Sequence, residues 1–359
     1  MYGKNGFCVL GTSDADRWMD ILGEIGAYDL YHLPSYSRLA ETQGEGSAVL
    51  LAHKEDGCTI AFPLLLREIG FPGAPGLKDA TSCYGYPGPI SSETDLPHSV
   101  RLHFTEHMQD FLESEGVITA FTRLNPLLDQ KHILDGYGQV AEIGPTISID
   151  LSVPLEEQFA RYRKTTRYEV RRLRKMGFVC EKVGPEHLDE FISIYYGTMD
   201  SVKAGAGYYF DRSYFEYLLN EMGDVFHLFM CRDGEKIACA AMFGLCGEIV
   251  QYHLAGTAED YRRLAPMKLL LDDARQWAFE SGARVMHLGG GVGASHDSLF
   301  AFKQGFSDRQ HIYRIWRHVV NPEVYAMLCE SARSTGAVPD DSYFPLYRHP
   351  ALASRQSQG

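Results

Sequence analysis

A lysine stands among aromatic and aliphatic residues near the end of the chain. Lys303 lies in the segment 302–306 (F-K-Q-G-F), and Leu299, Phe300 and Phe302 surround it at helical spacing. Burial disfavours an ammonium group, whereas a neighbouring carboxylate or phosphate restores it. The pattern predicts that Lys303, with Phe302 beside it, holds an RNA phosphate or stabilises negative charge during acyl transfer. A lysine that snorkels to the surface is the structural alternative.

A glycine-rich loop, residues 289–293 (G-G-G-V-G), follows a predicted strand and precedes the lysine helix. Backbone N–H groups at such a place can hold an anion or an oxyanion, which makes Gly290 and Gly291 candidate substrate-binding residues. A flexible turn is the alternative, because glycine is common in loops. His296 and His253 are candidate bases, although isolated histidines are more often structural.

Positive charge is concentrated in one segment of an acidic chain. The formal net charge is -13, which argues against a surface coated with nucleic acid. Residues 161–175 nevertheless hold eight basic residues and one acidic residue. The spacing predicts a helix with a basic stripe that could follow RNA phosphates, unless it is a solvated face. The predicted RNA-binding residues are Arg163, Lys164, Arg167, Arg171, Arg172, Arg174 and Lys175.

Acyl-CoA is the alternative acyl donor. Enzymes that use it cradle the pyrophosphate with backbone N–H groups in a glycine-rich turn before a long helix. The matching residues here, 262–267 (R-R-L-A-P-M), contain bulky side chains and a proline. The sequence therefore disfavours coenzyme A without excluding it. A non-catalytic module that binds peptide or RNA is a third hypothesis, and the intact Lys303 segment argues against it.

The order of predicted elements indicates two mixed α/β domains. Strands are expected at residues 48–53, 58–67, 117–122 and 146–151, with a helix at 100–115 and an irregular aromatic loop at 71–89. The second half repeats the pattern, with a helix at 155–176, helices at 186–199 and 211–222, three strands between 225 and 254, a helix at 266–280 and a strand at 284–288. A helix at 322–334 is expected to pack on the first domain, before a polar tail at 351–359.

These elements predict a mixed sheet in two tandem acetyltransferase-like (GNAT) domains. The first comprises 1–147 plus 318–359, and the second comprises 148–317. Several tyrosines could line an acceptor pocket with flat amphipathic faces, although packing in the core is an equal alternative. They are Tyr84, Tyr86, Tyr208, Tyr209 and Tyr252.

Composition limits the remaining possibilities. No run approaches the ~20 apolar residues that span a bilayer, and residues 1–10 lack the pattern of an export signal. The eight cysteines are scattered without metal-ligand spacing. We therefore expect a soluble cytoplasmic protein with free thiols, no membrane insertion and no metal.

The strand, glycine loop and F-K-x-G-F segment together resemble the Fem family of aminoacyl-tRNA-dependent transferases, which add amino acids to peptidoglycan precursors. The resemblance extends from residues 33–36 (L-P-S-Y) through 123–126 (R-L-N-P) to Phe306. It implies that Phe302 and Lys303 lie where the charged 3′ end of tRNA meets the acceptor, and that Tyr252 belongs to the acceptor site. The implied co-substrate is aminoacyl-tRNA, with no other cofactor.

Two departures concern the acceptor side, to which Arg123 and Asn125 would belong. Cell-wall members carry an acidic residue at the position of Asn125, and an arginine in the segment 198–210, where this chain offers only Lys203. The chain thus resembles more closely the branch that aminoacylates small peptides or amines in antibiotic pathways. The acceptor is expected to be the amine of a peptide or small molecule, either an antibiotic intermediate or a peptidoglycan precursor, and no motif indicates the oligomeric state.

Overall fold

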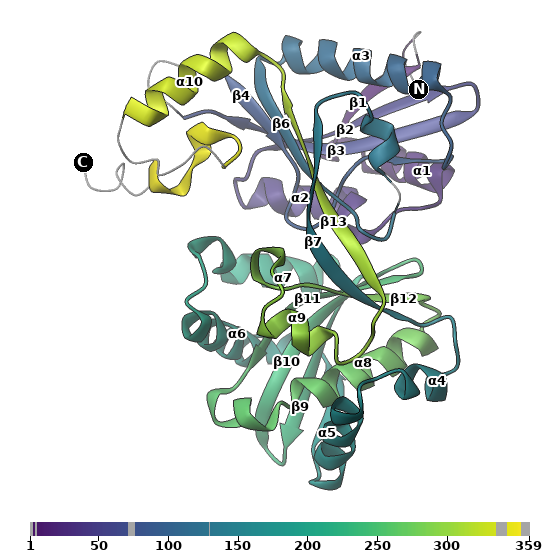
Figure 1. The fold of residues 1–359 in the computed structure, drawn as a ribbon, viewed down its shortest axis with the longest axis vertical. Coiled ribbons are helices and arrows are strands. Elements are labelled where there is room, and N and C mark those ends of the chain that lie inside the picture. Colours follow the sequence, from purple (N-terminus) through teal and green to yellow (C-terminus); the bar gives the residue numbers. More distant parts are fainter. Residues whose placement is uncertain (1–2, 4–5, 71–75, 129, 335–342, 353–359) are drawn as a thin grey trace. The chain divides into compact units, whose positions relative to one another are not determined.

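The structure is a computed structural model that describes residues 3, 6–70, 76–128, 130–334 and 343–352. The chain forms two compact units. Unit 1 comprises Met1–Ala27, Tyr31–Glu142 and Arg314–Gly359, and unit 2 comprises Tyr28–Leu30 and Ile143–Tyr313. Each unit is described by itself below, with the labels of Figure 1.

Unit 1 is built on a mixed sheet in the order β1-β2-β3-β4-β6-β13, with β5 paired to β3. All neighbours are antiparallel except β4 and β6, which are parallel. The strands are β1 (Phe7–Gly11), β2 (Ser47–Glu55), β3 (Cys58–Glu68), β4 (Lys78–Thr81), β5 (Ile90–Ser91), β6 (Val117–Leu124) and β13 (Gln310–Val319).

In the described part of unit 1 the α-helices are α1 (Ala15–Ile25), α2 (Pro34–Thr42), α3 (His98–Ser114) and α10 (Pro322–Ser334). The buried face of α3 meets β2, β3 and β6 in the main core, where Phe104, Met108 and Phe62 are fully buried. Helix α10 packs its Leu328 against Ile118 of β6 in a smaller cluster, as expected for the helix at 322–334.

The prediction that residues 71–89 are irregular throughout was wrong, because 78–81 form strand β4. Its place between β3 and β6 supplies hydrogen-bond partners on both sides, which outweighs the glycine and proline content of the flanking chain. Residues 71–75 of the predicted loop lie outside the described residues, as does 353–359 of the predicted tail.

The strands of unit 2 pair in the order β7-β12-β11-β10-β9-β8. Only β11 and β12 are parallel. The strands are β7 (Gln139–Asp150), β8 (Val179–Val183), β9 (Phe226–Asp233), β10 (Lys236–Cys246), β11 (Ile249–Thr257) and β12 (Val285–Gly290). The helices are α4 (Leu155–Ala160), α5 (Lys164–Lys175), α6 (Leu188–Val202), α7 (Arg212–Asn220), α8 (Met267–Glu280) and α9 (Ser298–Lys303).

Helix α8 lies across the sheet of unit 2, and with α5 it buries the apolar side chains of β9 and β10 (Figure 1). Fully buried members of this core include Leu270 and Ala274 of α8 and Phe243 of β10. The alternation of side chains along a strand leaves the neighbouring positions to the opposite face. There α6 contacts β10 and β11.

A single helix over 155–176 is not what the structure contains, because α4 and α5 are separated at residues 161–163. Tyr162 is buried at the break, and its hydroxyl donates to Asp272 Oδ1 at 3.1 Å. The Arg163 N–H donates to Gly305 O instead of to a helical carbonyl. Tertiary contacts of Tyr162 therefore interrupt a pattern that is locally helical.

The limits of the compact units fall within strands β7 and β13, at 142/143 and 313/314. The domain limits expected from the sequence, 147/148 and 317/318, fall in the same two strands and stay a prediction. Among the residues that the structure describes, no helix is long and apolar enough to cross a membrane.

Gly256, where β11 contacts α6, and Gly197, on the exposed side of α6, should respond oppositely to alanine. At Gly256, a Cβ would lie 2.6 Å from Ile194 O, a backbone atom that cannot yield without moving α6. We expect Gly256→Ala to lower the free energy of unfolding by about 1–3 kcal/mol. Gly197 is within α6 with open space around it, so Gly197→Ala should raise stability by about 0.5–1 kcal/mol. Urea denaturation measures both, and equal effects would contradict the close packing of α6.

Candidate active site

The parallel strands β11 and β12 part next to the predicted acyl-transfer residues. Their register pairs end at Gln251 and His287. Beyond this point β11 continues along β10, whereas β12 shifts register between His287 and Gly289 and follows β7. Tyr252 follows Gln251 directly, and Gly290 is three residues beyond His287. The Tyr252 ring and the Gly290 carbonyl both lie near the Lys303 ammonium group.

Lys303 is directed into unit 2, with 7% of its surface exposed. Its Nζ donates a hydrogen bond to Gly290 O at 2.7 Å and lies 6.0 Å from the centroid of the Tyr252 ring. A Cβ at Gly289, whose φ is +75°, would lie 3.2 Å from Nζ, so glycine there admits the ammonium group. Lys303 is thus buried, so the snorkelling alternative was wrong, whereas its role in acyl transfer stays a prediction.

The helix that carries Lys303 is fixed at both ends. Asp297 caps its start by accepting a hydrogen bond from the Phe300 N–H at 2.8 Å. Phe300 and Phe306 are buried in the unit 2 core, and Phe302 packs against that core with its ring 5.5 Å from Phe306. At Gly305, a Cβ would lie 2.6 Å from Thr166 Oγ1, so the glycine of the motif allows α9 to approach α5.

Burial lowers the pKa of Lys303 to about 8, and the charge of Asp297 opposes that shift. The pKa of Asp297 itself is lowered, first by the backbone hydrogen bond from Phe300. Burial raises the pKa of the Tyr252 hydroxyl, which therefore stays a neutral phenol at physiological pH. The site can consequently present a weakly solvated cation beside a neutral aromatic ring at neutral pH.

Polar groups of the glycine loop are hydrogen-bonded within the protein, which the sequence did not predict. Gly289 and Gly290 end β12, and Gly290 supplies the carbonyl for Lys303. The Val292 N–H already donates to Asp297 Oδ2 at 3.0 Å. A Cβ at Gly291 would lie 2.4 Å from Asp297 Oδ1, so this glycine admits the capping carboxylate. Substrate binding by Gly290 and Gly291 stays a prediction.

A chain of buried polar side chains lies at the last register pair of β11 and β12. Gln251 Nε2 donates to Asp29 Oδ2 at 2.6 Å, and Gln251 Oε1 lies 2.8 Å from His287 Nδ1. Because the Gln251 oxygen faces the ring, Nδ1 must be the protonated nitrogen. Burial, with the nearby charge of Lys303, lowers the pKa of His287 to about 3, so the ring is neutral.

Sequence reasoning missed Asp29, Gln251 and His287. The available signal was weak: Gln251 and His287 are polar residues inside otherwise apolar strands, and such residues are usually hydrogen-bonded when buried. No local pattern indicates Asp29. It belongs to the three-residue segment Tyr28–Leu30, which is part of unit 2 although it is far from the rest of that unit in the sequence.

Of the two candidate bases, His253 is partly buried, with Nε2 2.9 Å from the Tyr214 hydroxyl. Burial lowers its pKa to about 3, which makes it a poor proton acceptor near neutral pH. His296 is exposed and packs edge-on against Phe300, with 4.7 Å between ring centroids. Neither is placed in the polar chain that ends at His287.

Tyr208 and Tyr209 lie after α6, where both are exposed. The Tyr209 hydroxyl donates to Asp200 Oδ1 at 2.8 Å, and the Tyr208 carbonyl accepts from the Tyr195 hydroxyl. These contacts tie the segment to α6. Lining of an acceptor pocket by either tyrosine stays a prediction.

The remaining predicted acceptor residues belong to unit 1. The Asn125 side chain accepts from the Leu127 N–H at 2.9 Å, so it shapes its own turn. The Arg123 guanidinium lies 5.5 Å from the Phe121 ring centroid. Tyr86 packs edge-on against Tyr31, and Tyr84 is in the same loop. Their contact with substrate stays a prediction.

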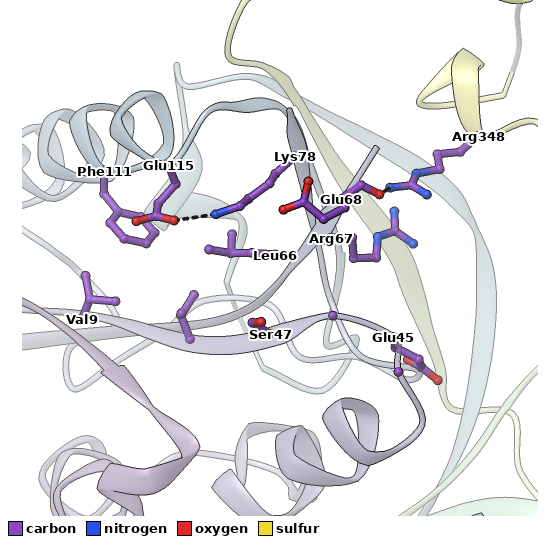
Figure 2. Close-up of a pocket in the computed structure, with 13 residues that line it drawn as sticks. Val9, Glu45, Ser47, Leu66, Arg67, Glu68, Lys78, Phe111, Glu115 and Arg348 are labelled. Carbon is purple, nitrogen blue, oxygen red and sulfur yellow. Dashed lines mark hydrogen bonds and ion pairs between the residues drawn. The ribbon is translucent and has the colours of Figure 1, made fainter. Parts of the chain in front are cut away.

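Unit 1 also contains a cavity of about 680 Å³ (Figure 2). Arg67 and Arg348 both bind the buried carboxylate of Asp79, at 2.8 and 2.6 Å. Lys78 pairs with Glu115 at 2.9 Å across the same cavity (Figure 2). Its cations are thus already matched by carboxylates, and the arrangement does not by itself define a ligand.

The basic segment divides into two groups. Four of its arginines bind protein groups by hydrogen bonds. Arg161 donates to Asp150 and Glu157, Arg163 to Gln304 Oε1, Arg167 to the carbonyls of residues 160 and 162, and Arg174 to Asp272 and Asp273. Arg171 lies over the Phe159 ring at 5.3 Å. A different face of α5 carries the exposed residues Lys164, Tyr168, Arg172 and Lys175.

The turn before α8, where acyl-CoA enzymes bind pyrophosphate, is occupied by its own hydrogen bonds. The Ala265 N–H donates to Arg262 O, and the Lys268 N–H donates to Ala265 O. Pro266 has no N–H. The Arg262 side chain bonds to Ser201 and to Gly197 O. Few backbone donors are therefore presented by this turn.

Residues 160–304 match the family model described as Acetyltransferase (GNAT) domain. No curated protein matches the chain. Among solved structures, the fold is similar to FemX, with 14% identity and a TM-score of 0.69 over 89% of this chain and 99% of that one.

Two further structures share the fold. One is the C-terminal domain of a putative lysylphosphatidylglycerol synthetase from Agrobacterium fabrum (18% identity, TM-score 0.52, 89% of this chain, 96% of that one). The other is a tandem GNAT protein from the clavulanic acid biosynthesis pathway, with 11% identity and a TM-score of 0.50 over 88% of this chain and 98% of that one. The predicted fold, a mixed α/β structure with two tandem GNAT-like domains, is confirmed.

The buried state of Lys303 has a measurable consequence for stability. Its pKa is about 8 in the folded chain, against an ordinary value of 10.5. Below pH 8 the lysine is charged in both folded and unfolded states. Between these two pKa values the unfolded chain binds a proton that the folded chain has released, so stability rises with pH. The free energy of unfolding of the native protein should therefore increase relative to that of Lys303→Met from pH 8 to 10.

Chemical denaturation of both proteins at pH 7, 8, 9 and 10 measures this difference, because other titrating groups cancel between the variants. A difference that does not change with pH would show that Lys303 is solvated.

Proposed function

We propose that the protein is an aminoacyl-tRNA-dependent transferase, which forms an amide bond between an aminoacyl group and the amine of a peptide or small-molecule acceptor. The buried ammonium of Lys303 beside Tyr252 carries the proposal. It is supported by the GNAT fold, by the resemblance of residues 302–306 to the Fem motif, and by the exposed basic face of α5.

Lys303 suits the chemistry of acyl transfer from an ester. When an amine attacks the ester carbonyl, negative charge develops on its oxygen, and a cation of low solvation stabilises that charge strongly. Among the described residues, only Gly290 O accepts a hydrogen bond from Nζ, which has three N–H groups. Two therefore remain for the oxyanion or for a phosphate of the tRNA end. A pKa of about 8 keeps the group mostly charged at neutral pH.

No strong protein base is required in this proposal. The attacking amine can lose its proton to the departing ribose oxygen, which leaves the protein to position and polarise the ester. This agrees with the lowered pKa values of His253 and His287, which make both rings weak bases.

The second candidate is an acyl-CoA-dependent N-acyltransferase, which the GNAT domain match favours. Its donor needs backbone N–H groups for the pyrophosphate. The turn before α8 uses those of Ala265 and Lys268 internally, and Pro266 offers none. This observation favours tRNA over coenzyme A as the carrier of the acyl group.

The face of α5 formed by Lys164, Tyr168, Arg172 and Lys175 is the better candidate for RNA contact. These residues are three or four positions apart, so they share one side of the helix. Tyr168 is 65% exposed among the three cations. An exposed aromatic ring among cations fits unpaired bases, which stack on the ring while cations meet phosphates.

A donor assay tests the proposal. Purified protein is mixed with a pool of peptide amines and either radiolabelled aminoacyl-tRNA or radiolabelled acetyl-CoA. We expect label to reach an acceptor from aminoacyl-tRNA alone. Transfer from acetyl-CoA alone would establish the second candidate, and transfer from neither would favour a non-catalytic binding module.

Lys303→Ala serves as the inactive variant in that assay and should lower turnover about 10²–10³-fold, as the loss of an oxyanion donor does. Lys54→Ala is the matched control, because Lys54 forms an exposed pair with Glu24 in unit 1. Circular dichroism checks that both variants fold. Near-normal turnover in Lys303→Ala would contradict the assignment.

RNA binding should depend on the exposed face of α5. The double variant Arg172→Gln with Lys175→Gln should weaken tRNA binding and reduce its salt dependence, because each lost phosphate contact lowers the slope by about 0.7–0.9. The control, Arg212→Gln with Arg284→Gln, removes the same charge where each arginine already pairs with a carboxylate. Filter binding from 50 to 300 mM salt measures both, and equal slopes would exclude this face.

A further inference from the structure

Three cysteines stand directly opposite one another on three neighbouring strands of unit 2. Cys180 of β8 is in register with Cys231 of β9, and Cys231 is in register with Cys239 of β10. Directly opposite residues of antiparallel strands point to the same face of a sheet. The three thiols therefore form a row across the sheet, which we call the thiol row.

The spacing of the thiol row suits a disulfide bond. Opposite Cα atoms in antiparallel strands are about 4.5 or 5.5 Å apart, depending on the type of pair. Both distances fall within the range of about 4.4–6.8 Å that disulfides span. The two strands already hold the sulfurs side by side, so little backbone movement is needed to join them.

The row also has an entrance from solvent. Cys231 and Cys239 are fully buried, whereas Cys180 is partly exposed. Strand β8 is the edge of the unit 2 sheet, so Cys180 is the member nearest to the solvent boundary. A small uncharged oxidant can therefore reach this end of the row first.

We propose that Cys180 and Cys231 form a peroxide-sensitive pair, which closes to a cross-strand disulfide. One sulfur of the pair, as thiolate, attacks a peroxide oxygen, and the products are a sulfenic acid and water or an alcohol. The second thiol then attacks the sulfenic sulfur and displaces water. Two protons and two electrons leave the pair, and they reduce the peroxide.

Hydrogen bonds couple the thiols of the row. Those from Cys180 and Cys239 lower the pKa of the Cys231 thiol, whereas the hydrogen bond with Cys231 raises the pKa of the Cys180 thiol. Cys231 is therefore the member of the pair that carries the thiolate. A thiolate is the reactive form of cysteine. Cys180 also hydrogen-bonds to Asp273, whose pKa burial raises to about 6. Among the described residues no group of His, Cys, Asp and Glu could hold a metal ion, so the row is not a metal site.

Cys8 provides an internal control. It is partly exposed on β1, at the edge of the unit 1 sheet, as Cys180 is in unit 2. The residue opposite Cys8 is Ala52. Cys8 can thus be oxidised by peroxide but has no thiol across the strand with which to close.

Peptide mapping of the full-length protein tests the proposal. The reduced protein is treated with hydrogen peroxide, its remaining thiols are alkylated, and it is digested with trypsin without reductant. Trypsin separates the row into peptides 176–182, 213–232 and 237–262. We expect 176–182 linked to 213–232, two hydrogens lighter than the sum of both, and released by dithiothreitol. Cys8 should yield sulfenic acid or higher oxides without an internal link.

Serine variants distinguish the outcomes. Cys231→Ser should leave a Cys180 sulfenic acid that dimedone labels, and Cys239→Ser should keep the disulfide. The proposal fails if Cys180 stays alkylatable while Cys8 is oxidised, or if the link joins two molecules on a non-reducing gel. It also fails if Cys180→Ser still links 213–232 to 237–262, since oxidation would then not require Cys180. Thermal unfolding checks that each variant is folded.

Discussion

Removing an ammonium group from water costs free energy, and several groups of unit 2 offset part of that cost at Lys303. One carbonyl, that of Gly290, accepts its hydrogen bond, and a left-handed glycine at 289 leaves room for the charge. Asp297 caps the helix while contributing a favourable charge. These partners offset only part of the lost hydration, so the pKa of Lys303 is lowered. An incoming anion would therefore stabilise the ammonium group further.

The GNAT fold positions this lysine through the parting of two parallel strands. Gln251 and His287 form the last register pair, in which Gln251 donates a hydrogen bond to Asp29 and accepts one from His287. The same fold commonly holds a pyrophosphate at the turn before its long helix. Here that turn is closed by its own hydrogen bonds, whereas α5 presents cations along a face. A polyanion carried by a long molecule is better matched by such a face than by a single turn.

Much of the architecture was predictable because strong local patterns mark it. The apolar runs of strands β2, β3, β9 and β10, and the periodic helices α3 and α8, lie close to their predicted positions. The errors have tertiary causes. Strand β4 forms because β3 and β6 flank it, and α4 ends because Tyr162 is buried against Asp272. Sequence reasoning also did not identify α1, α2 or β8, although the buried apolar residues of α1 stand at helical spacing.

The sequence by itself determined that Lys303 stands among aromatic residues, because this is visible in the order of residue types. It also determined the concentration of positive charge at residues 161–175. Only the tertiary structure decided which of these cations bind protein groups and which face solvent. It likewise decided that Asp29 supports His287, and that three scattered cysteines stand in one row. The physical reason is that partners far apart in the chain meet through strand register and helix packing, which no local pattern encodes.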